Sequence, residues 1–236
     1  MEMTALNKMV PLDFRPKESV SMGAQLHRIL RKAIIEGILA PGQALSETET
    51  SKQFSISRQP VREAFIKLGE ERLIEILPQR GSYVRRISVK EVLDARHLRE
   101  IIEVSIVREV TEHHDDTLIS DLRDIVARQK KVDPGDSAGF YELDEEFHKS
   151  IALHAGREYA WRVTEGIKAQ MNRVRYLAID FATPTKLLID EHAAIIDSIE
   201  AGDAGLAVSH IEGHLRRLLT SLPLIARQYP EHFVDE

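Results

Sequence analysis

Two helical segments separated by a turn of only three residues limit the possible folds of this chain more than any other sequence feature. Ser46 and Glu49 have the spacing of a capping box, which predicts that a short helix begins there. Residues 55–57 would then form the turn, and Ser57 would cap a second helix. Pro60 falls in the first turn of that helix, where its missing N–H has no helical partner to lose. The expected buried stripe of the second helix is Val61, Ala64, Phe65 and Leu68. This arrangement is a helix-turn-helix unit.

The second helix of this unit begins with two arginines one turn apart, although the chain as a whole carries a net charge of −6. Arg58 and Arg62 lie on a different face from the apolar stripe. Residues 23–86 contain 11 lysines and arginines but only 7 glutamates, so this segment carries +4 and the rest of the chain −10. The asymmetry favours a polyanion as partner, and arginines at the start of a second helix favour double-stranded DNA. The alternative is that the arginines form only surface ion pairs, for example with Glu63.

A strand–turn–strand pattern follows the second helix directly. Residues 73–77 and 82–87 have the composition of strands, and residues 78–81 between them indicate a turn. A β-hairpin after a recognition helix is a wing, and Arg80 and Gly81 at its tip suit a contact with the DNA backbone or minor groove. A further amphipathic helix is expected before the unit, with its apolar positions at Leu26, Ile29, Leu30, Ala33, Ile34 and Ile38.

This first part of the chain resembles the winged-helix domain of the GntR family of bacterial transcription regulators. The resemblance covers residues 23–86 without gaps, and its core is the stretch PGQALSETETSKQFSISRQPVREAFIKLGEERLIEILPQRGSYV. It implies that operator DNA is contacted by Ser57, Arg58, Gln59, Arg62 and Gly81. Three departures from the family pattern leave the operator sequence open. Thr48 stands where some members have an arginine, Thr50 stands at a usually apolar position, and Arg72 replaces a common glycine.

The remainder of the chain has helical spacing throughout, with capping residues or helix breakers between the segments. The six expected helices are residues 88–110, 116–133, 136–156, 158–179, 185–201 and 203–222. Short connections between such helices favour a bundle. This part resembles the all-helical FCD ligand-binding domain of the FadR branch of GntR regulators. The predicted fold class is therefore mainly α, with an N-terminal winged helix-turn-helix domain and a C-terminal all-α helical bundle. The predicted domain limits are a leader at 1–20, the DNA-binding domain at 21–87, the FCD-type domain at 88–222 and a C-terminal tail at 223–236.

Four polar side chains are expected on the inward faces of three of these helices. Asp144 and His148 lie one turn apart on a single face, while His192 and His214 lie on apolar stripes. Burying unpaired polar groups is costly, and a metal ion bound by three imidazoles and one carboxylate would satisfy all four. The alternative is that each histidine is hydrogen-bonded within the core. Helical spacing also leaves other histidines as competing ligands, namely His113, His114, His154 and His210.

The resemblance to FCD domains selects among these alternatives. The ligand positions of metal-binding FCD domains match Asp144, His148, His192 and His214, which implies a divalent ion, with zinc favoured over nickel, manganese or iron. The same resemblance implies that Arg99, Arg173 and Arg175 face the carboxylate of a small effector, which the planar guanidinium can bind through two hydrogen bonds. The alternative for Arg99 is an i, i+4 surface pair with Glu103, which contributes only about 0.3–0.5 kcal/mol.

The composition narrows the class of protein further. The chain contains no cysteine, so disulfides and thiolate metal sites are excluded and a reducing cytoplasm is favoured. Its first residues lack the apolar core of a signal peptide, and no run approaches the roughly 20 apolar residues of a membrane span. We therefore expect a cytoplasmic protein with no membrane partner.

The predicted function is a ligand-responsive transcription repressor that binds operator DNA as a homodimer, because helix-turn-helix proteins usually bind two symmetric half-sites. A metal-dependent hydrolytic enzyme is the main alternative, since an Asp/His₃ site with open positions can activate water. That alternative leaves the winged helix unexplained. A non-catalytic interaction module is the third class, and it leaves the buried metal ligands unexplained.

Overall fold

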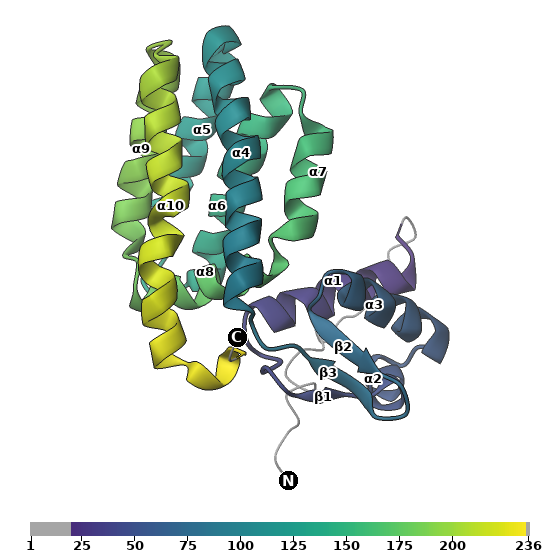
Figure 1. Cartoon of the computed structure of the whole chain (residues 1–236). Coiled ribbons are helices and arrows are strands. Elements are labelled where there is room, and N and C mark those ends of the chain that lie inside the picture. Colours follow the sequence, from purple (N-terminus) through teal and green to yellow (C-terminus); the bar gives the residue numbers. More distant parts are fainter. Residues whose placement is uncertain (1–19, 235–236) are drawn as a thin grey trace. The chain divides into compact units, whose positions relative to one another are not determined.

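The computed structural model describes residues 20–234, which divide into two compact units (Figure 1). The first unit contains the described residues of Met1–Val89 and Tyr229–Glu236, and the second is Lys90–Gln228. The expected leader lies outside the described residues except for Val20. Each unit buries a hydrophobic core of its own.

The first unit combines helices with a small antiparallel sheet. Its elements from Met22 to Val84 are α1 (Met22–Ile35), β1 (Ala44–Leu45), α2 (Glu47–Phe54), α3 (Arg58–Glu70), β2 (Ile74–Leu77) and β3 (Gly81–Val84). The strand order is β1-β3-β2, and Glu75 lies opposite Tyr83 in the β2–β3 hairpin. Helix α3 packs against α1, where Leu26, Phe65 and Leu68 are almost completely buried. The predicted winged helix-turn-helix domain is confirmed.

The turn between α2 and α3 forms as the sequence predicts, except at its second cap. Ser46 accepts a hydrogen bond from the Glu49 amide at 3.3 Å. Ser55 ends α2 in the left-handed conformation, with a φ of 53°. Ser57 is the N-cap residue of α3, but its side chain makes no capping hydrogen bond with any described residue. A serine cap normally engages the amide of the second or third helical residue, and the third is Pro60, which has no N–H.

A cluster of ionisable side chains joins α1 to the end of α3. Glu71 lies 2.6 Å from His27 Nε2 and accepts a hydrogen bond of 2.6 Å from Arg31 Nε. Burial opposes ionisation of Glu71, but the histidine and the arginine outweigh burial and lower the pKa of its carboxyl group. The cluster therefore holds the C-terminal end of α3 against α1 while Glu71 is ionised.

The second unit is a bundle of helices, as predicted for this part of the chain. Its helices are α4 (Val89–His113), α5 (Asp116–Gln129), α6 (Ser137–His154), α7 (Glu158–Ile167), α8 (Ala169–Phe181), α9 (Thr185–Glu200) and α10 (Ala204–Gln228). The first residue of α4, Val89, is the residue directly before this unit. Helix α5 packs against α6 and α9, and α9 packs against α10. Within residues 20–234, no helix is both long enough and apolar enough to cross a membrane.

The structure corrects one expected helix of the bundle. Residues 158–179 form two helices, α7 and α8, rather than one, and Lys168 lies at the break with a φ of −89° and a ψ of 4°. The sequence pattern hides the break because apolar residues keep helical spacing across it. In the structure the Lys168 ammonium is buried, where it pairs with Glu145 and lies 3.9 Å from the centroid of the Trp161 ring.

The structure also corrects the expected end of the last helix. Helix α10 continues past residue 222 through Pro223 to Gln228, although a proline removes one helical hydrogen bond. The helix persists because its apolar stripe continues, with Leu222 and Ile225 buried. The described residues after it are also ordered into structure rather than a tail. They contain the 3₁₀ helix η2 (Pro230–His232), and Phe233 forms a parallel bridge with Ile87 inside the first unit.

Candidate DNA interface and candidate metal centre

The first two turns of α3 present a polar surface to solvent. Ser57, Arg58, Gln59 and Arg62 are all exposed, whereas Val61 on the opposite face is buried. The structure therefore brings the sequence-predicted helix residues together on one accessible face. Arginines on such a face can contact phosphates and the edges of bases in the major groove.

Both arginines make contacts that are easily exchanged for DNA. Arg58 donates to Thr48 Oγ1 at 2.6 Å, and Arg62 Nε lies 3.5 Å from Glu47 Oε1. Glu63, named above as a possible partner in the alternative of surface ion pairs, instead accepts a hydrogen bond from Gln59 at 3.2 Å. Exposed pairs of this kind contribute about 0–1 kcal/mol, so breaking them costs less free energy than a contact with a base contributes.

The tip of the β2–β3 hairpin requires glycine. Gly81 has a φ of 102°, a conformation in which a side chain would be strained. Tyr83 donates its hydroxyl to the Arg80 carbonyl at 2.8 Å, which fixes the tip across the turn. Arg80 and Gly81 are both exposed at this tip.

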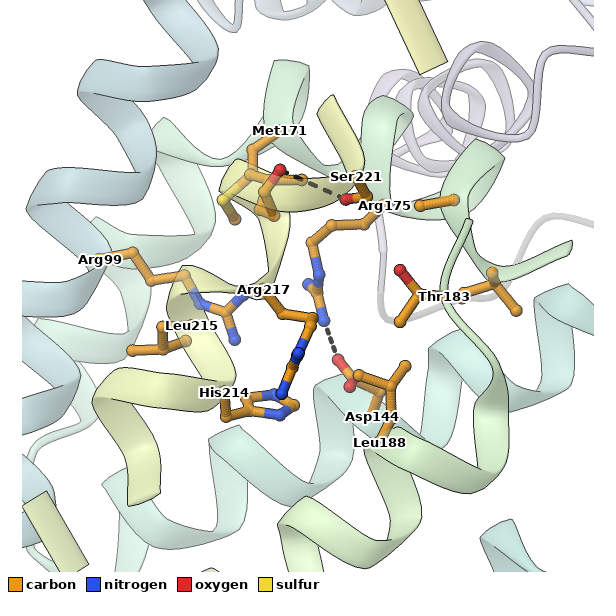
Figure 2. Close-up of a pocket in the computed structure, with 13 residues that line it drawn as sticks. Arg99, Asp144, Met171, Arg175, Thr183, Leu188, His214, Leu215, Arg217 and Ser221 are labelled. Atoms are coloured by element: carbon orange, nitrogen blue, oxygen red, sulfur yellow. Dashed lines mark hydrogen bonds and ion pairs between the residues drawn. The ribbon is translucent and has the colours of Figure 1, made fainter. Parts of the chain in front are cut away.

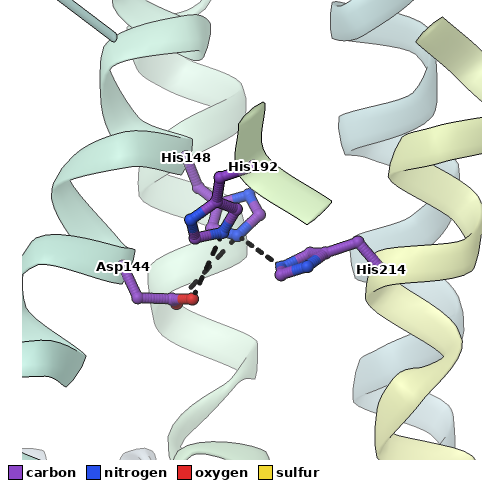
Figure 3. Close-up of side chains that lie close together, drawn as sticks. All are labelled: Asp144, His148, His192 and His214. Atoms are coloured by element: carbon purple, nitrogen blue, oxygen red, sulfur yellow. Dashed lines mark hydrogen bonds and ion pairs between the residues drawn. The ribbon is translucent and has the colours of Figure 1, made fainter. Parts of the chain in front are cut away.

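Three helices of the second unit bring four potential metal ligands together (Figure 3). Asp144 and His148 come from α6, His192 from α9 and His214 from α10. One ligand atom from each residue lies within 4.8 Å of all the others, and all four side chains are buried. The Nε2 atoms of His148 and His214 are 3.2 Å apart, and His192 Nε2 lies 3.6 Å from Asp144 Oδ1.

The chemistry of this cluster fits a divalent metal ion. His192 Nε2 is buried and has no hydrogen-bond partner within residues 20–234, which is costly unless an ion or another ligand occupies the centre. Three imidazole nitrogens and one carboxylate oxygen are donors that suit zinc, nickel, manganese and iron. Asp144 can bind a metal ion through Oδ1 while Oδ2 remains ion-paired with Arg175.

Three of the four cluster residues have the protonation states that a metal requires. Burial lowers the pKa of His148 and lowers that of His192 well below the usual value, so both imidazoles are neutral near pH 7. Burial would raise the pKa of Asp144, but the paired Arg175 guanidinium holds it well below its ordinary range. Neutral imidazoles and an ionised carboxylate offer lone pairs to a cation without first losing protons.

The competing histidines lie elsewhere and have other partners. Their Nδ1 atoms lie near backbone carbonyl oxygens, at 3.2 Å for His113, 3.0 Å for His114, 2.9 Å for His154 and 3.0 Å for His210. None of them belongs to the buried cluster found among the described residues. The spacing of the sequence alone left these alternatives open, and helix packing separates them.

A small cavity of about 50 Å³ opens beside the cluster (Figure 2). Its polar lining includes Asp144 and His214 of the cluster together with Arg99, Arg175 and Arg217. The apolar part of the lining is Met171, Ala178, Ile179, Leu188, Leu215 and Leu218. This volume accommodates roughly four water-sized groups. Metal ligands and arginines therefore line one partly open pocket.

The arginines differ in how they are held. Arg99 Nε donates to Glu103 at 2.6 Å inside the bundle, so this pair is buried and not the surface pair considered above. Arg175 pairs with Asp144 and donates to Glu145 at 2.7 Å. Arg173 does not line the cavity, because two residues along a helix turn a side chain to another face. Arg173 instead donates to Gln170 at 3.1 Å.

Several residues around the site were not predicted from the sequence. Arg217 lines the cavity and pairs with Glu191, and its position three residues after His214 on the same helix was an available signal. Glu191 and Gln129 contact the outer nitrogens of His214 and His192 at 3.0 Å each. No sequence spacing indicated the contact of Gln129, because it depends on how α5 packs against α9.

Comparison with protein families identifies both units. Residues 23–84 match the family described as bacterial regulatory proteins, gntR family, and residues 94–217 match the FCD domain. Members of the first family bind operator DNA and typically dimerise. FCD domains can bind a metal ion, and the cluster described above has fitting donors.

The chain is similar along nearly its whole length to known regulators. It is 36% identical to the HTH-type transcriptional repressor RspR of Escherichia coli (strain K12) over 233 residues, covering 96% of this chain and 99% of that protein. It is 26% identical to the gluconate operon transcriptional repressor of Bacillus licheniformis over 220 residues, covering 88% of this chain and 90% of that protein.

Solved structures with the same fold include E. coli McbR/YncC, with a TM-score of 0.72 and 18% identity over 89% of this chain and 99% of that one. A putative GntR transcriptional regulator from Rhodococcus sp. RHA1 has a TM-score of 0.71 and 24% identity over 86% and 99% of the two chains. The chain therefore belongs to the GntR family of bacterial transcription regulators, with a FadR-type architecture in which an FCD domain follows the winged helix, and it is a ligand-responsive DNA-binding regulator, not an enzyme.

Proposed function

We propose that this regulator is a repressor that carries a divalent metal ion, with zinc favoured, and releases its operator when a small carboxylic acid binds beside that metal. The metal would be held by Asp144, His148, His192 and His214. With one carboxylate ligand the metal site keeps a net positive charge, which favours an anionic effector. The names of the E. coli and B. licheniformis relatives support repression as the mode of action.

The observation that carries the effector proposal is an unsatisfied donor in the cavity. Arg99 is 3% exposed, and its Nη2 finds no hydrogen-bond partner in the described part of the chain. Figure 2 shows its side chain pointing from α4 toward the cavity that Asp144 and His214 also line. A buried, unpaired guanidinium nitrogen is costly, and a carboxylate oxygen would satisfy it. A second oxygen of the same acid would complete the coordination of the metal, near Arg175.

DNA recognition is proposed to rest on the exposed face of α3 and on the wing. Ser57, Arg58, Gln59 and Arg62 would contact the operator from the helix, and Gly81 would let the wing backbone approach it closely. A homodimer would present two such helices to symmetric half-sites. A broad exposed face of α4 carries Leu93, Leu98 and Ile101, and burying these apolar side chains against a second copy would favour the dimer.

Calorimetric titration of small mono- and dicarboxylic acids into the zinc-loaded protein tests the effector proposal. Arg99→Gln removes the charged donor and should weaken an acid that binds the wild type by about 10- to 100-fold. Arg96→Gln is the matched control, since Arg96 lies on the same helix and pairs with Glu100 away from the cavity. Equal affinity in the wild type and Arg99→Gln would refute the proposed effector contact.

A further inference from the structure

The outer nitrogen of each histidine in the cluster meets an oxygen of another side chain. His192 Nδ1 lies 3.0 Å from Gln129 Oε1 and His214 Nδ1 lies 3.0 Å from Glu191 Oε2, both with hydrogen-bond geometry. His148 Nδ1 lies 2.8 Å from Glu103 Oε2, within ion-pair distance but without the geometry of a hydrogen bond. The three oxygens come from three different helices, α4, α5 and α9. Two of these helices, α4 and α5, contribute none of the four candidate ligands.

These contacts determine which nitrogen of each ring can bind a cation. A neutral imidazole has one N–H and one lone pair, so an acceptor at Nδ1 places the proton there and leaves the lone pair on Nε2. The carboxylates of Glu103 and Glu191 also pair with Arg99 and Arg217, and a carboxylate paired with an arginine accepts hydrogen bonds. All three Nε2 atoms face the centre of the cluster, where His148 and His214 approach to 3.2 Å.

We propose that Glu103, Gln129 and Glu191 are positioning residues that hold the three histidines in the tautomer and orientation required for metal binding. The inference rests on the proposed metal site. It extends that site from three helices to five, so that α4 and α5 are tied to the metal through their side chains.

Two of the three positioning residues also contact arginines of the cavity, which connects the metal to the effector space. Glu103 accepts from Arg99 Nε at 2.6 Å, and Glu191 accepts from Arg217 Nε at 2.9 Å. Gln129 differs because it carries no charge, and its amide nitrogen is buried without a hydrogen-bond partner among residues 20–234. Gln129 is therefore the cleanest position at which to separate the role of an acceptor from that of an ion pair.

Zinc affinity, measured by competition with a chromophoric chelator on the full-length protein, tests the proposal. Gln129→Leu removes the acceptor and nearly preserves volume, and it should weaken zinc binding by about 10- to 100-fold. Gln129→Glu keeps an acceptor and should retain at least the wild-type affinity. Glu191→Gln should weaken zinc binding in the same direction. Glu100→Gln is the control, because Glu100 lies on α4 one turn before Glu103 and pairs with Arg96 and Arg216 instead of a histidine.

The tautomers of the metal-free protein provide a readout that packing alone would not move. Long-range ¹H–¹⁵N NMR spectra of the wild type should show His192 protonated at Nδ1, and Gln129→Leu should shift it toward the Nε2-protonated form. If the wild type binds zinc but Gln129→Leu and Glu191→Gln bind it equally well, or if wild-type His192 carries its proton on Nε2, the positioning role is wrong and the metal site stands. If the wild type itself binds no divalent metal, the proposed metal site fails, and this inference fails with it.

Discussion

After the substitution His192→Ala, adding or removing a metal ion should hardly change the stability of the second unit. His192 is fully buried and stacks on Phe147 with the ring centroids 4.1 Å apart, so part of the lost stability comes from packing. The metal contributes separately. At a free zinc concentration of about 100 times Kd, binding to the native state adds about 2.7 kcal/mol to the free energy of unfolding. If losing one of four ligands raises Kd by about 100-fold, the same zinc concentration adds only about 0.4 kcal/mol.

The assay is thermal unfolding with and without a chelator, which cancels the packing contribution in each protein. Chelation should lower the melting temperature of the wild type on the order of 10 °C and change that of His192→Ala only slightly. His113→Ala is the control, because His113 is exposed and lies outside the cluster, and it should respond to chelator as the wild type does. An equal chelator effect in the wild type and His192→Ala would refute the ligand assignment.

Three further predictions concern the DNA-binding unit and the core. Arg62→Ala should weaken operator binding by about 1–3 kcal/mol in a fluorescence anisotropy titration and reduce its salt dependence, whereas Lys67→Ala, farther along the exposed side of α3, should do so much less. Glu71→Gln should lower the free energy of unfolding by about 1 kcal/mol at pH 7. Because the folded pKa of Glu71 is lowered, its contribution to the free energy of unfolding is fully present above the unfolded pKa near 4.5 and is lost as pH falls through the folded pKa. In chemical denaturation, the free energies of unfolding of the wild type and Glu71→Gln should therefore become equal in acid. Ile196→Ala should cost about 2–5 kcal/mol, and the exposed Leu206→Ala less than about 0.5 kcal/mol, by the same measurement.

The sequence was most informative where local geometry decides the outcome. The capping residues and the short turn predicted the helix-turn-helix, because caps and turns depend on neighbouring residues. The period of a helix placed Asp144 and His148 on one face, and the apolar stripes of two other helices predicted inward positions for His192 and His214. The structure brings these four residues into one cluster.

The sequence was less informative where contacts join segments far apart in the chain. Gln129 reaches His192 across 63 residues, and Arg217 reaches Glu191 across 26. Such contacts depend on how helices pack, which no spacing within one helix reveals. The break at Lys168 and the passage of α10 through Pro223 were missed for a related reason, since tertiary packing overrides the local signals at both places.

The same limit applies to the arginines. Arg173 and Arg175 are two residues apart, and both were expected to face the effector. Of these two, Arg175 lines the cavity and Arg173 does not, because helix α8 turns the two side chains to different faces.

The missing cap at Ser57 has a local cause. Its residue type and position suit a cap, but the proline three residues later has no amide N–H for it to engage.

A titration of operator DNA with and without a small carboxylic acid, performed on the zinc-loaded wild type and on the Asp144→Ala/His192→Ala double variant, tests most directly whether the metal site transmits the effector signal. An effector changes DNA affinity only by its differential affinity for the DNA-competent and incompetent states. We expect the acid to weaken operator binding by the wild type by about 5–150-fold. The double variant should bind the operator as the wild type does without acid and should not respond when acid is added. Equal responses of the two proteins would contradict the proposed mechanism and assign the cluster a purely structural role.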